Sequence, residues 1–509
     1  MSQKFTNIQV GLDEDLEEKI SWLVPNFESF HILKKSIDAR KRGDIHFVYS
    51  LEVYGPGEQE KVEDISLEPV NYKAEPPIII GSGPAGLFAA LRFVEKGVPC
   101  KLFEKGSTTN ERMKAIAKFW RYGELNKKNN VCFGEGGAGL FSDGKLITRI
   151  KSPHIPYVMD RLIRFGAPEE IRYLANPHVG SDRIRRVIPQ IRNYLQNNGC
   201  EIHFDTEITE LMYKNQEVVG VKTEHHQEFY SPHIILACGH SAEGLFQHLH
   251  ESGVAITGKS FAVGFRVEHP QELINKIQYR EHYQHPKLSA ANYKLTFNDK
   301  EKDLGIYSFC MCPGGYVLSS GTEDWGLVTN GMSNYNRNSA FANAAIVVTV
   351  DHNKSFKEDV FGGIKYRNSI ERKAKDLVVQ AGGHQQLPAQ LVSDFFAGKT
   401  SALGKVSSPS GAIACRLDNL FSSEVHQALE KAMSSFERKM PGFTQNKALF
   451  YAVESRTSCP LQITRDKESL QSISHQGLYP TGEGAGYAGG ITSAACDGIK
   501  VAEAIMSLY

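Results

Sequence analysis

A net charge and long hydrophobic runs are what this 509-residue sequence lacks. Its 58 lysine and arginine residues balance its 58 aspartate and glutamate residues, so no field of one sign attracts nucleic acid or anionic membranes. No stretch approaches the roughly 18 apolar residues that a membrane span requires, and the first residues form no apolar signal segment. We therefore expect a cytoplasmic protein without a membrane partner and with nucleic acid disfavoured as a partner. The length predicts roughly two to four domains.

Cysteine is also scarce, with nine residues scattered along the chain. An odd number without regular spacing does not predict a disulfide framework, so we expect mostly structural, reduced thiols. Cys310 and Cys312 would point to the same face of a strand, about 7 Å apart, which is too far for an unstrained disulfide. Zinc would need two more ligands, and no second cysteine or histidine pair has ligand spacing. We therefore expect the two cysteines to pack, and we expect no metal.

Glycine is abundant, and its arrangement near residue 80 is the most informative feature present. Residues 78–86 read Ile-Ile-Ile-Gly-Ser-Gly-Pro-Ala-Gly, followed by an apolar helix and the strand Lys-Leu-Phe-Glu104. Such glycines allow a tight strand-to-helix turn and close approach of the backbone to a pyrophosphate, which the helix N-terminus attracts. Glu104 lies 21 residues beyond Gly83, where a carboxylate can hydrogen-bond ribose hydroxyls. The order of these elements predicts a dinucleotide-binding β-α-β unit.

The rest of the chain predicts an α/β protein with a Rossmann-like domain built from discontinuous segments. Residues 1–70, with an apolar start near 8–10, a helix from Asp13 and two strands near 30–34 and 45–54, predict a small N-terminal α/β module. Its charged segment 38–42 predicts a solvated loop more strongly than a partner or RNA contact. A linker is expected over 55–77, and the dinucleotide-binding domain over 76–245 and 466–509. An α+β substrate domain would be inserted at 246–465.

A second glycine-rich turn, at residues 482–490, precedes the last helix. A helix N-terminus there would direct a positive dipole end at a flavin and favour its anionic reduced form. The candidates in this turn are Glu483 and the N–H groups of Gly489, Gly490 and Ile491.

Several longer motifs resemble a known family. They are residues 130–146 (Asn-Val-Cys-Phe-Gly-Glu-Gly-Gly-Ala-Gly-Leu-Phe-Ser-Asp-Gly-Lys-Leu), 178–182, 264–270, 310–316 and 454–460. They resemble the uncharacterised FAD-dependent dehydrogenases of the glutathione-reductase-like flavoprotein superfamily, over the chain from the N-terminal module to Tyr509. The resemblance implies bound FAD and a redox role, and it implies no particular substrate. Cys238, Leu140 and Cys459 depart from the common pattern, and Cys459 would alter the polarity near a flavin.

The resemblance also implies roles for individual positions. Arg112 would face the pyrophosphate, Ser142 to Lys145 would form the loop beside the flavin ring, and the backbone of Ile208 would meet adenine. The residues expected to bind the cofactor are Gly81, Gly83, Pro84, Ala85, Gly86, Glu104, Lys105, Arg112, Gly139, Ser142, Asp143, Gly144, Lys145, Ile208, Gly239, Gly482, Glu483, Gly489, Gly490 and Ile491. No histidine or cysteine attachment site is evident, so noncovalent FAD is expected.

The catalytic candidates are ionisable groups in or beside these turns, namely Lys145, His240, Arg266 and Arg456. Arg266 and Glu268 alternate along one strand face, and a structural ion pair between them is at least as good an interpretation as catalysis. His240 follows a strand and precedes a helix, so it is either a proton donor or a cap of the helix. The guanidinium of Arg456 suits a substrate carboxylate or the flavin carbonyls.

Three functions remain open. The first, which we favour, is an FAD-dependent dehydrogenase or reductase that transfers hydride between the flavin and a small organic substrate. The second is a flavin monooxygenase, although the Asp-Gly motif usual in that class is missing after Cys238-Gly239. The third is a flavoprotein whose N-terminal module binds RNA or another macromolecule. With one dinucleotide fingerprint, electrons would come from a transient NAD(P)H, from an electron-donor protein or from the substrate.

Overall fold

The computed structural model describes residues 2–41, 43–58, 67–445 and 447–509. The N-terminal module is an antiparallel sheet in the order β1-β3-β2, formed by β1 (Gln3–Gly11), β2 (Ser29–Asp38) and β3 (His46–Tyr54). Helix α1 (Leu16–Leu23) begins after Asp15, whose carboxylate accepts the N–H groups of Glu17 and Glu18. It packs Ile20 against the sheet. Strand β2 hydrogen-bonds through Lys35 to residues 173 and 175 of the main body.

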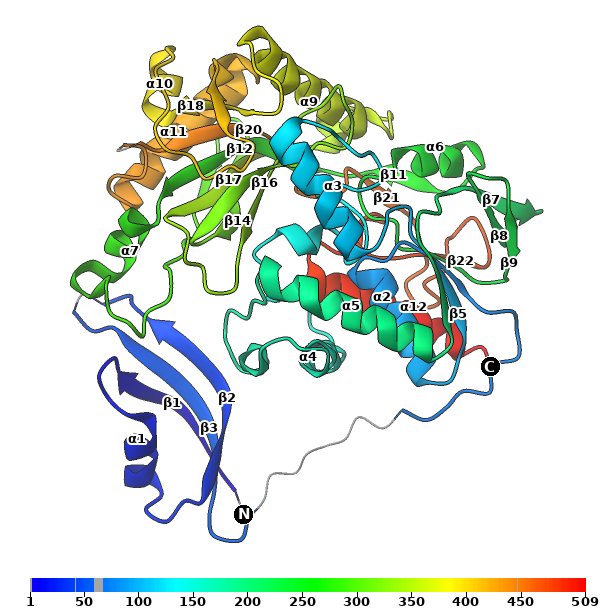
Figure 1. The fold of residues 1–509 in the computed structure, drawn as a ribbon, viewed down its shortest axis with the longest axis horizontal. Coiled ribbons are helices and arrows are strands. Elements are labelled where there is room, and N and C mark those ends of the chain that lie inside the picture. Colours follow the sequence, from blue (N-terminus) through cyan, green and yellow to red (C-terminus); the bar gives the residue numbers. More distant parts are fainter. Residues whose placement is uncertain (1, 42, 59–66, 446) are drawn as a thin grey trace.

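The main body contains a parallel five-stranded sheet, of which Figure 1 labels β5 and β22 on its right-hand side. Its order is β22-β10-β4-β5-β6, from β4 (Ile78–Ile80), β5 (Cys100–Phe103), β6 (Cys200–His203), β10 (Ile234–Leu236) and β22 (Leu478–Pro480). The last strand comes from a segment more than 200 residues beyond the others. The strands are buried on both faces, so they consist largely of isoleucine and leucine without polar alternation.

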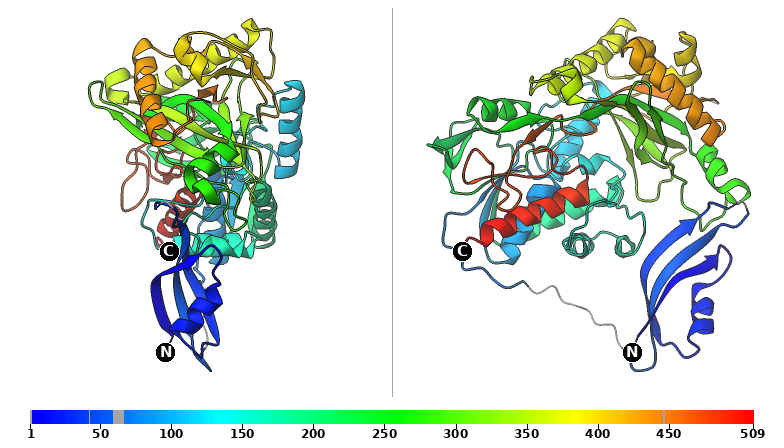
Figure 2. Two further views of the ribbon diagram at one scale, coloured as in Figure 1. Left: turned by 90° about the vertical axis from the view of Figure 1, so that its left-hand side faces the viewer. Right: turned by 180° about the vertical axis from the view of Figure 1, so that it is seen from behind.

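Helices cover one face of this sheet and a small antiparallel sheet covers the other. The covering helices are α2 (Pro84–Glu95), α3 (Thr109–Tyr122), α4 (Ile155–Arg164), α5 (Ser181–Asn197) and α12 (Ile491–Met506). Figure 2 shows α12 beside α2 from behind; Gly498 permits this approach, because a Cβ there would meet the Ala85 carbonyl oxygen at 2.0 Å. The opposite face packs on α6 (Glu243–Glu251) and on the sheet β7 (Ile208–Lys214), β8 (Glu217–Thr223) and β9 (Glu228–Tyr230).

The chain leaves this unit and returns to it through one antiparallel pair, β11 (Ile256–Gly258) with β21 (Leu461–Ile463). Between these strands lies a mixed seven-stranded sheet in the order β13-β14-β17-β12-β20-β18-β19. Its strands are β12 (Phe261–Pro270), β13 (Thr296–Asp299), β14 (Leu304–Cys312), β17 (Phe341–Val350), β18 (Leu387–Leu391), β19 (Ala412–Ala414) and β20 (Leu449–Glu454).

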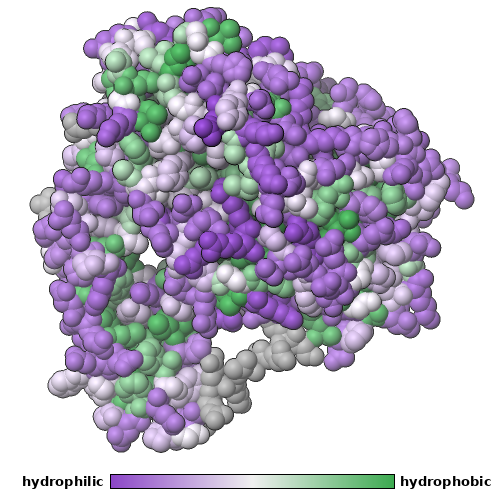
Figure 3. All heavy atoms as spheres, in the orientation of Figure 1, coloured by the Kyte–Doolittle hydropathy of each residue, from purple (hydrophilic) through white to green (hydrophobic). Residues whose placement is uncertain are grey.

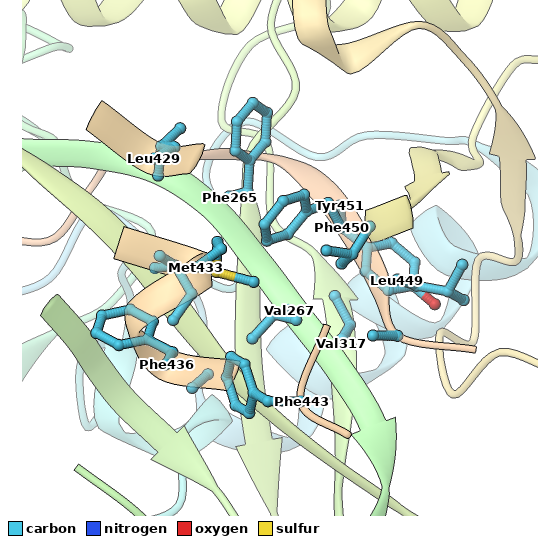
Figure 4. Packing of buried hydrophobic residues seen from close by; sticks show 14 of the residues in the cluster. Phe265, Val267, Val317, Leu429, Met433, Phe436, Phe443, Leu449, Phe450 and Tyr451 are labelled. Atoms are coloured by element: carbon cyan, nitrogen blue, oxygen red, sulfur yellow. The ribbon is translucent and has the colours of Figure 1, made fainter. Parts of the chain in front are cut away.

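Helices α9 (Gly362–Gln380), α10 (Val392–Ala397) and α11 (Ser423–Lys439) pack over one face of the seven-stranded sheet. Figure 4 shows Met433 of α11 directed at Val267 of β12, and Phe436 belongs to the same buried cluster. The aliphatic and aromatic residues here form a buried cluster as large as the one between the parallel sheet and its helices. The smaller elements are α7 (Gln271–Tyr279), α8 (His352–Ser355) and the hairpin of β15 (Gly315–Ser319) with β16 (Thr329–Ser333).

The fold is the α/β class that the sequence predicted, with a parallel sheet assembled from separated segments. The seven-stranded sheet, residues 261–454, lies within the predicted insertion at 246–465, and the limits of the three domains remain predictions. Of the predicted linker, residues 59–66 lie outside the described residues. Figure 3 shows the molecule in the orientation of Figure 1. The surface in view is largely hydrophilic, and its hydrophobic side chains lie in separate groups. Among the residues described, no helix has the length and apolar character needed to cross a membrane.

Candidate functional site

Strand order brings the predicted cofactor residues to one edge of the parallel sheet. The chain runs from β4 outward to β5 and β6 on one side, whereas β10 and β22 lie on the other side. Ligands of such sheets bind beyond the carboxyl ends of the strands where the order reverses, which here is between β4 and β10. Gly81 follows β4, Glu104 follows β5, Gly239 follows β10 and Gly482 follows β22. These residues, distant in sequence, therefore surround one crevice edge.

The glycines at this edge are of two kinds. Gly81 and Gly86 are required by the protein itself, since a Cβ would lie 2.4 Å from the Ala237 carbonyl oxygen and 1.9 Å from the Gly81 carbonyl oxygen, respectively. A Cβ on Gly83 would meet only the Cα of Gly137, at 3.8 Å. Gly239 and Gly489 would meet nothing within 4 Å. The second kind faces open space. The left-handed φ of +70° accounts for glycine at position 239, whereas the fold alone does not explain why positions 83 and 489 are glycine.

Two helices begin at this edge without a side-chain cap. Gly83 is the N-cap of α2, Pro84 and Ala85 open that helix, and Gly490 is the N-cap of α12, which starts at Ile491. The first N–H groups of an uncapped helix carry a partial positive charge and attract anions. Asp497 of α12 holds the second turn, because its carboxylate accepts the N–H of Gly482 at 2.8 Å. In the second turn the Gly489 N–H also donates to the Ser493 hydroxyl, at 3.4 Å. Both helices nevertheless begin without a capping side chain in the described residues, as a pyrophosphate site at a helix N-terminus requires.

The residues after β5 support the first turn. Glu104 is buried; one carboxylate oxygen accepts the Ser82 N–H (3.0 Å) and hydroxyl (2.6 Å), and the other accepts the Gly106 N–H at 2.8 Å. Lys105 forms an ion pair with Glu207 at 2.9 Å, just before Ile208, which opens β7. In this structure Glu104 therefore ties the turn to the segment after β5 through both of its carboxylate oxygens.

Arg112 has different partners from those expected. Its fully buried guanidinium donates to the carbonyls of Asn130, Val131, Glu135 and Gly137, at 2.8 to 3.1 Å. Burial, only partly offset by Glu104, lowers the pKa of Arg112 to about 10. Four of its five donors are used, so the expectation that Arg112 faces the pyrophosphate directly is corrected. It shapes the glycine-rich loop over that position.

The loop expected beside the flavin ring carries a charge cluster. The buried carboxylate of Asp143 accepts two hydrogen bonds from Arg337, at 2.9 and 2.5 Å, and pairs with the Lys145 ammonium at 3.0 Å. Lys145 also donates to the carbonyl of Met311. Although burial lowers the pKa of Lys145, the charge of Asp143 outweighs it and the net shift is upward. Lys145 is therefore a held cation at neutral pH.

The neighbouring loop residues fit this geometry closely. The Ser142 hydroxyl donates to the Gly139 carbonyl at 2.8 Å and accepts the Gly144 N–H at 3.0 Å. Gly144, at φ +65°, packs against the backbone of Gly180, where a Cβ would lie 2.8 Å from the Gly180 nitrogen. A Cβ on Gly139 would contact Ile491 at 3.1 Å, so this loop lies against the start of α12.

Glu483, in the second glycine turn, is a half-buried carboxylate that accepts no hydrogen bond from the described part of the chain. Burial raises the pKa of Glu483 to about 7, against the opposing charge of Lys259. A carboxylate in this state is available to a bound hydroxyl group, and it can exchange a proton near neutral pH.

His240 and Arg456 form one network with Glu371 of α9. Arg456 donates to both carboxylate oxygens of Glu371, at 3.0 and 2.9 Å, and to the hydroxyls of Ser241 and Thr322, at 2.8 and 2.9 Å. The predicted role of Arg456 in holding a substrate or flavin carbonyl is corrected, because its fork is occupied by Glu371. Burial, then the charges of Arg456 and Arg367, lower the pKa of His240 to about 3. His240 is neutral at physiological pH and unsuited to donate a proton.

Arg266 and Glu268 do not pair with each other, which corrects the other expectation for this strand. Arg266 is fully buried and donates to Glu454 at 2.9 and 3.0 Å and to the Asn343 side chain at 2.8 Å. Glu268 accepts the Tyr451 hydroxyl at 2.8 Å and the hydroxyl of Ser407. Burial raises the pKa of Glu268 to about 7. Both residues are internal to the seven-stranded sheet.

Cys310 and Cys312 also differ from expectation. The pairing of β14 with β17 shifts between Phe309 and Cys312, so one extra residue bulges from β14, and Cys310 adopts a left-handed φ of +46°. The bulge removes the regular spacing of about 7 Å that a straight strand imposes. The two thiols instead lie within hydrogen-bonding reach of each other. The spacing on which the packing expectation rested therefore does not apply at this bulge, although both cysteines are free thiols in the structure.

Sequence reasoning missed Arg337, Glu371 and Glu454, the partners of Asp143, Arg456 and Arg266. Glu454 begins the motif over residues 454–460 that also contains Arg456, so the sequence could have identified it as a candidate. Arg337 and Glu371 lie in segments without a motif, 194 and 85 residues from their partners. A buried cation that needs a counter-charge predicts that a partner exists, but not where it lies in the sequence.

Comparison with known sequences identifies relatives of the chain. Residues 260–457 match the family described as FAD-dependent protein, C-terminal domain-like, and residues 7–54 match a domain of unknown function, DUF8436. A protein of Clostridium beijerinckii, described as uncharacterized, is 38% identical over 535 aligned positions, which cover all of this chain and 99% of that protein.

Among solved structures, weak likenesses are found. CtdE in complex with FAD and a substrate has 13% identity and a TM-score of 0.37, over 86% of this chain and 82% of that one. A mutant of the halogenase PltM in complex with FAD has 9% identity and a TM-score of 0.41, over 86% and 70%. A flavoprotein/dehydrogenase of Cytophaga hutchinsonii has 11% identity and a TM-score of 0.38, over 85% and 78%. No functional conclusion follows from these structures at this level of similarity.

The edge of the parallel sheet fits FAD. Open glycines at positions 83, 239 and 489 leave room for a group against the backbone, two uncapped helices supply N–H donors, and Glu483 supplies an unused acceptor. The roles assigned to single residues remain predictions. With its full-length relative and the family match over residues 260–457, the chain belongs to a family of FAD-dependent proteins, and FAD is its cofactor.

Proposed function

We propose that this flavoprotein is a dehydrogenase or reductase that transfers hydride between its FAD and a small organic substrate. The observation that carries this proposal is the charge cluster of Asp143, Lys145 and Arg337, which joins the loop over residues 142–145 to the loop before β17 and, through the Met311 carbonyl, to β14. FAD, when bound, supplies two-electron redox chemistry. We further propose that the cofactor is held noncovalently by the two glycine turns.

The charge cluster supports reduction because its cation is held in place. Lys145 stays protonated, and Asp143 and the Met311 carbonyl hold its ammonium where the loop meets the seven-stranded sheet. A preorganised cation stabilises negative charge that develops beside it, without a cost of reorganisation. We assign Lys145 the role of stabilising that charge or of orienting an acidic or carbonyl group of the substrate.

Proton exchange is assigned to Glu483 in place of His240. A carboxyl group with a pKa near the working pH is suited to accept and release a proton, whereas a histidine with a pKa of about 3 is neutral throughout the physiological range. Arg456 and Arg266 are assigned no contact with the substrate, since each is bound to a buried carboxylate. The Arg266–Glu454 pair joins β12 to β20, and the Arg456–Glu371 pair joins the segment after β20 to α9.

The test is anaerobic reduction of the FAD-loaded protein, followed by its absorbance in a stopped-flow instrument. A set of candidate organic substrates, and NAD(P)H, should include one that bleaches the flavin, and Lys145→Met should slow that step by roughly 100-fold. Lys354→Met is the control, because Lys354 is exposed and pairs only with Asp303 of the surface. A product that carries oxygen from labelled dioxygen would instead make the protein a monooxygenase.

A further inference from the structure

The segment Cys310-Met311-Cys312 ends β14 at the bulge described above. Cys312 is fully buried and its thiol lies 3.3 Å from the Cys310 carbonyl oxygen, whereas Cys310 is half-buried. A positive φ is uncommon for a residue other than glycine, and such conformations cluster at functional sites. The bulge thus folds Cys312 back onto the backbone of Cys310, and the two thiols interact.

Two cations hold the backbone of this bulge. Lys145 donates to the carbonyl of Met311, and Arg266 donates to the carbonyl of Cys310 at 3.4 Å. Their charges act on the sulfur atoms, opposed by those of Asp143 and Glu483. The hydrogen bond from Cys312, followed by Lys145 and Arg266, lowers the pKa of the Cys310 thiol to about 6 against the effect of burial. The thiolate, which is the reactive form of cysteine, is therefore favoured at Cys310.

A second pair of cysteines provides an internal comparison. Cys100 and Cys200 face each other in register on β5 and β6, both buried in the apolar cluster beneath α2 and α5. Their thiols also interact, yet the hydrogen bond from Cys200 and burial raise the pKa of Cys100 well above its usual value. Proximity of two thiols does not by itself create a thiolate. At the bulge the pKa of Cys312 is likewise raised, by its hydrogen bond with Cys310 and by burial, while Cys310 receives that hydrogen bond together with the charges of Lys145 and Arg266, which have no counterpart among the causes of the Cys100 shift.

The bulge lies on the side of the seven-stranded sheet that meets the cofactor edge. Lys145 belongs to the loop over residues 142–145 and contacts the Met311 carbonyl between the two cysteines. The negative charge of Cys310 contributes to the raised pKa of Glu483 in the second glycine turn. Both of these residues come from the FAD-binding part of the chain. The thiols are consequently placed between the two parts of the site.

We propose that Cys310 and Cys312 form a redox-active dithiol that exchanges two electrons with the FAD. In the oxidative direction, the Cys310 thiolate and the Cys312 thiol form one sulfur–sulfur bond and release two electrons and one proton, which reduce oxidised FAD to its anionic reduced form. In the opposite direction, the same electrons and proton break the disulfide. This exchange rests on the redox activity of the flavin and on no particular organic substrate.

The experiment is an anaerobic titration of the oxidised, FAD-loaded protein with dithionite, with the thiols mapped before and after by alkylation and mass spectrometry. Wild type should take up two more electrons per FAD than Cys310→Ser. A disulfide between Cys310 and Cys312 should be present at the start and absent at the end. Cys132→Ser is the matched control, because Cys132 is a half-buried thiol whose hydrogen bond goes to the Ser320 carbonyl.

Equal electron uptake by wild type and Cys310→Ser overturns the proposal. A disulfide that persists while the flavin is reduced overturns it as well. This second result comes from the wild-type protein, so it does not depend on whether Cys310→Ser folds. The thiols of Cys100 and Cys200 should stay reduced throughout. Because dithionite replaces the organic substrate, the result is independent of whether the protein is a dehydrogenase.

Discussion

At the carboxyl edge of the parallel sheet, Glu104 contacts backbone groups of residues that are close to it in the sequence. In the seven-stranded sheet and at the end of β20, the contacts join charged side chains that are far apart in the sequence. Glu104 binds groups 22 and 2 residues away. Arg266 binds Glu454 across 188 residues, and Arg456 binds Glu371 across 85. The contacts of the first region lie within a glycine motif, so the local sequence predicts them. The second depends on ions that meet only after the chain has folded.

The difference has an energetic side. A glycine turn that faces a cofactor contributes little to the fold, so its substitution should affect binding. A buried ion pair returns little net stability when it is intact, but removal of one partner leaves an uncompensated charge. The two regions should therefore respond to mutation in opposite ways. Three measurements test this contrast.

The largest effect is expected behind the seven-stranded sheet. Glu371→Gln should lower the free energy of unfolding by about 3 to 5 kcal/mol, because it leaves the Arg456 guanidinium buried without its counter-charge. Urea unfolding of the protein measures it. Replacement of both partners, Glu371→Leu with Arg456→Met, should recover much of the loss. Glu301→Gln, at an exposed ion pair with Lys431, should change the stability by less than about 1 kcal/mol. An equally small loss in Glu371→Gln would contradict the contrast.

A smaller effect separates the two kinds of glycine within the first turn. Gly86→Ala should cost about 1 to 3 kcal/mol of stability without FAD, because its Cβ would clash with the Gly81 carbonyl. Gly83→Ala has room for a methyl group and a φ of −73°, so the protein without FAD should be as stable as wild type. Its affinity for FAD should fall, since the methyl group keeps the backbone away from the pyrophosphate. Thermal unfolding and titration with FAD check the pair, and unchanged FAD affinity in Gly83→Ala would remove Gly83 from the site.

The smallest effect concerns the pH dependence of the protein without FAD. The pKa of Glu483 is raised to about 7 from an ordinary 4.5, so the folded state holds a proton that the unfolded state has released between these values. The contribution of Glu483 to stability should therefore be present below about pH 4.5 and be lost as the pH rises to 7. Glu483→Gln should flatten this part of the profile. Identical profiles for wild type and variant would show that Glu483 does not titrate there, and Glu251→Gln on exposed α6 serves as the control.

The sequence by itself determined the parallel sheet, its first glycine turn and the cofactor, because each rests on local rules. Three apolar strands, glycines at 81, 83 and 86 and an acid after the second strand satisfy hydrogen bonds and steric limits within a few dozen residues. The second glycine turn was found in the same way. The position of the second glycine turn beside the first could not be predicted from the local sequence, because it follows from the pairing of β22 with β10.

Only the tertiary structure decided which charges meet and which residues stay reactive. Arg456 was expected to hold a carboxylate or the flavin carbonyls, and Arg266 to take part in catalysis or to pair with Glu268, but their partners are Glu371 and Glu454 from other elements. His240 was expected to be a proton donor or a helix cap, and burial with two arginines lowers its pKa. The bulge that joins Cys310 to Cys312 arises from register with β17 and not from the local sequence. Charge and solvent exclusion depend on everything packed around a group, and packing of distant segments is information that a local motif does not contain.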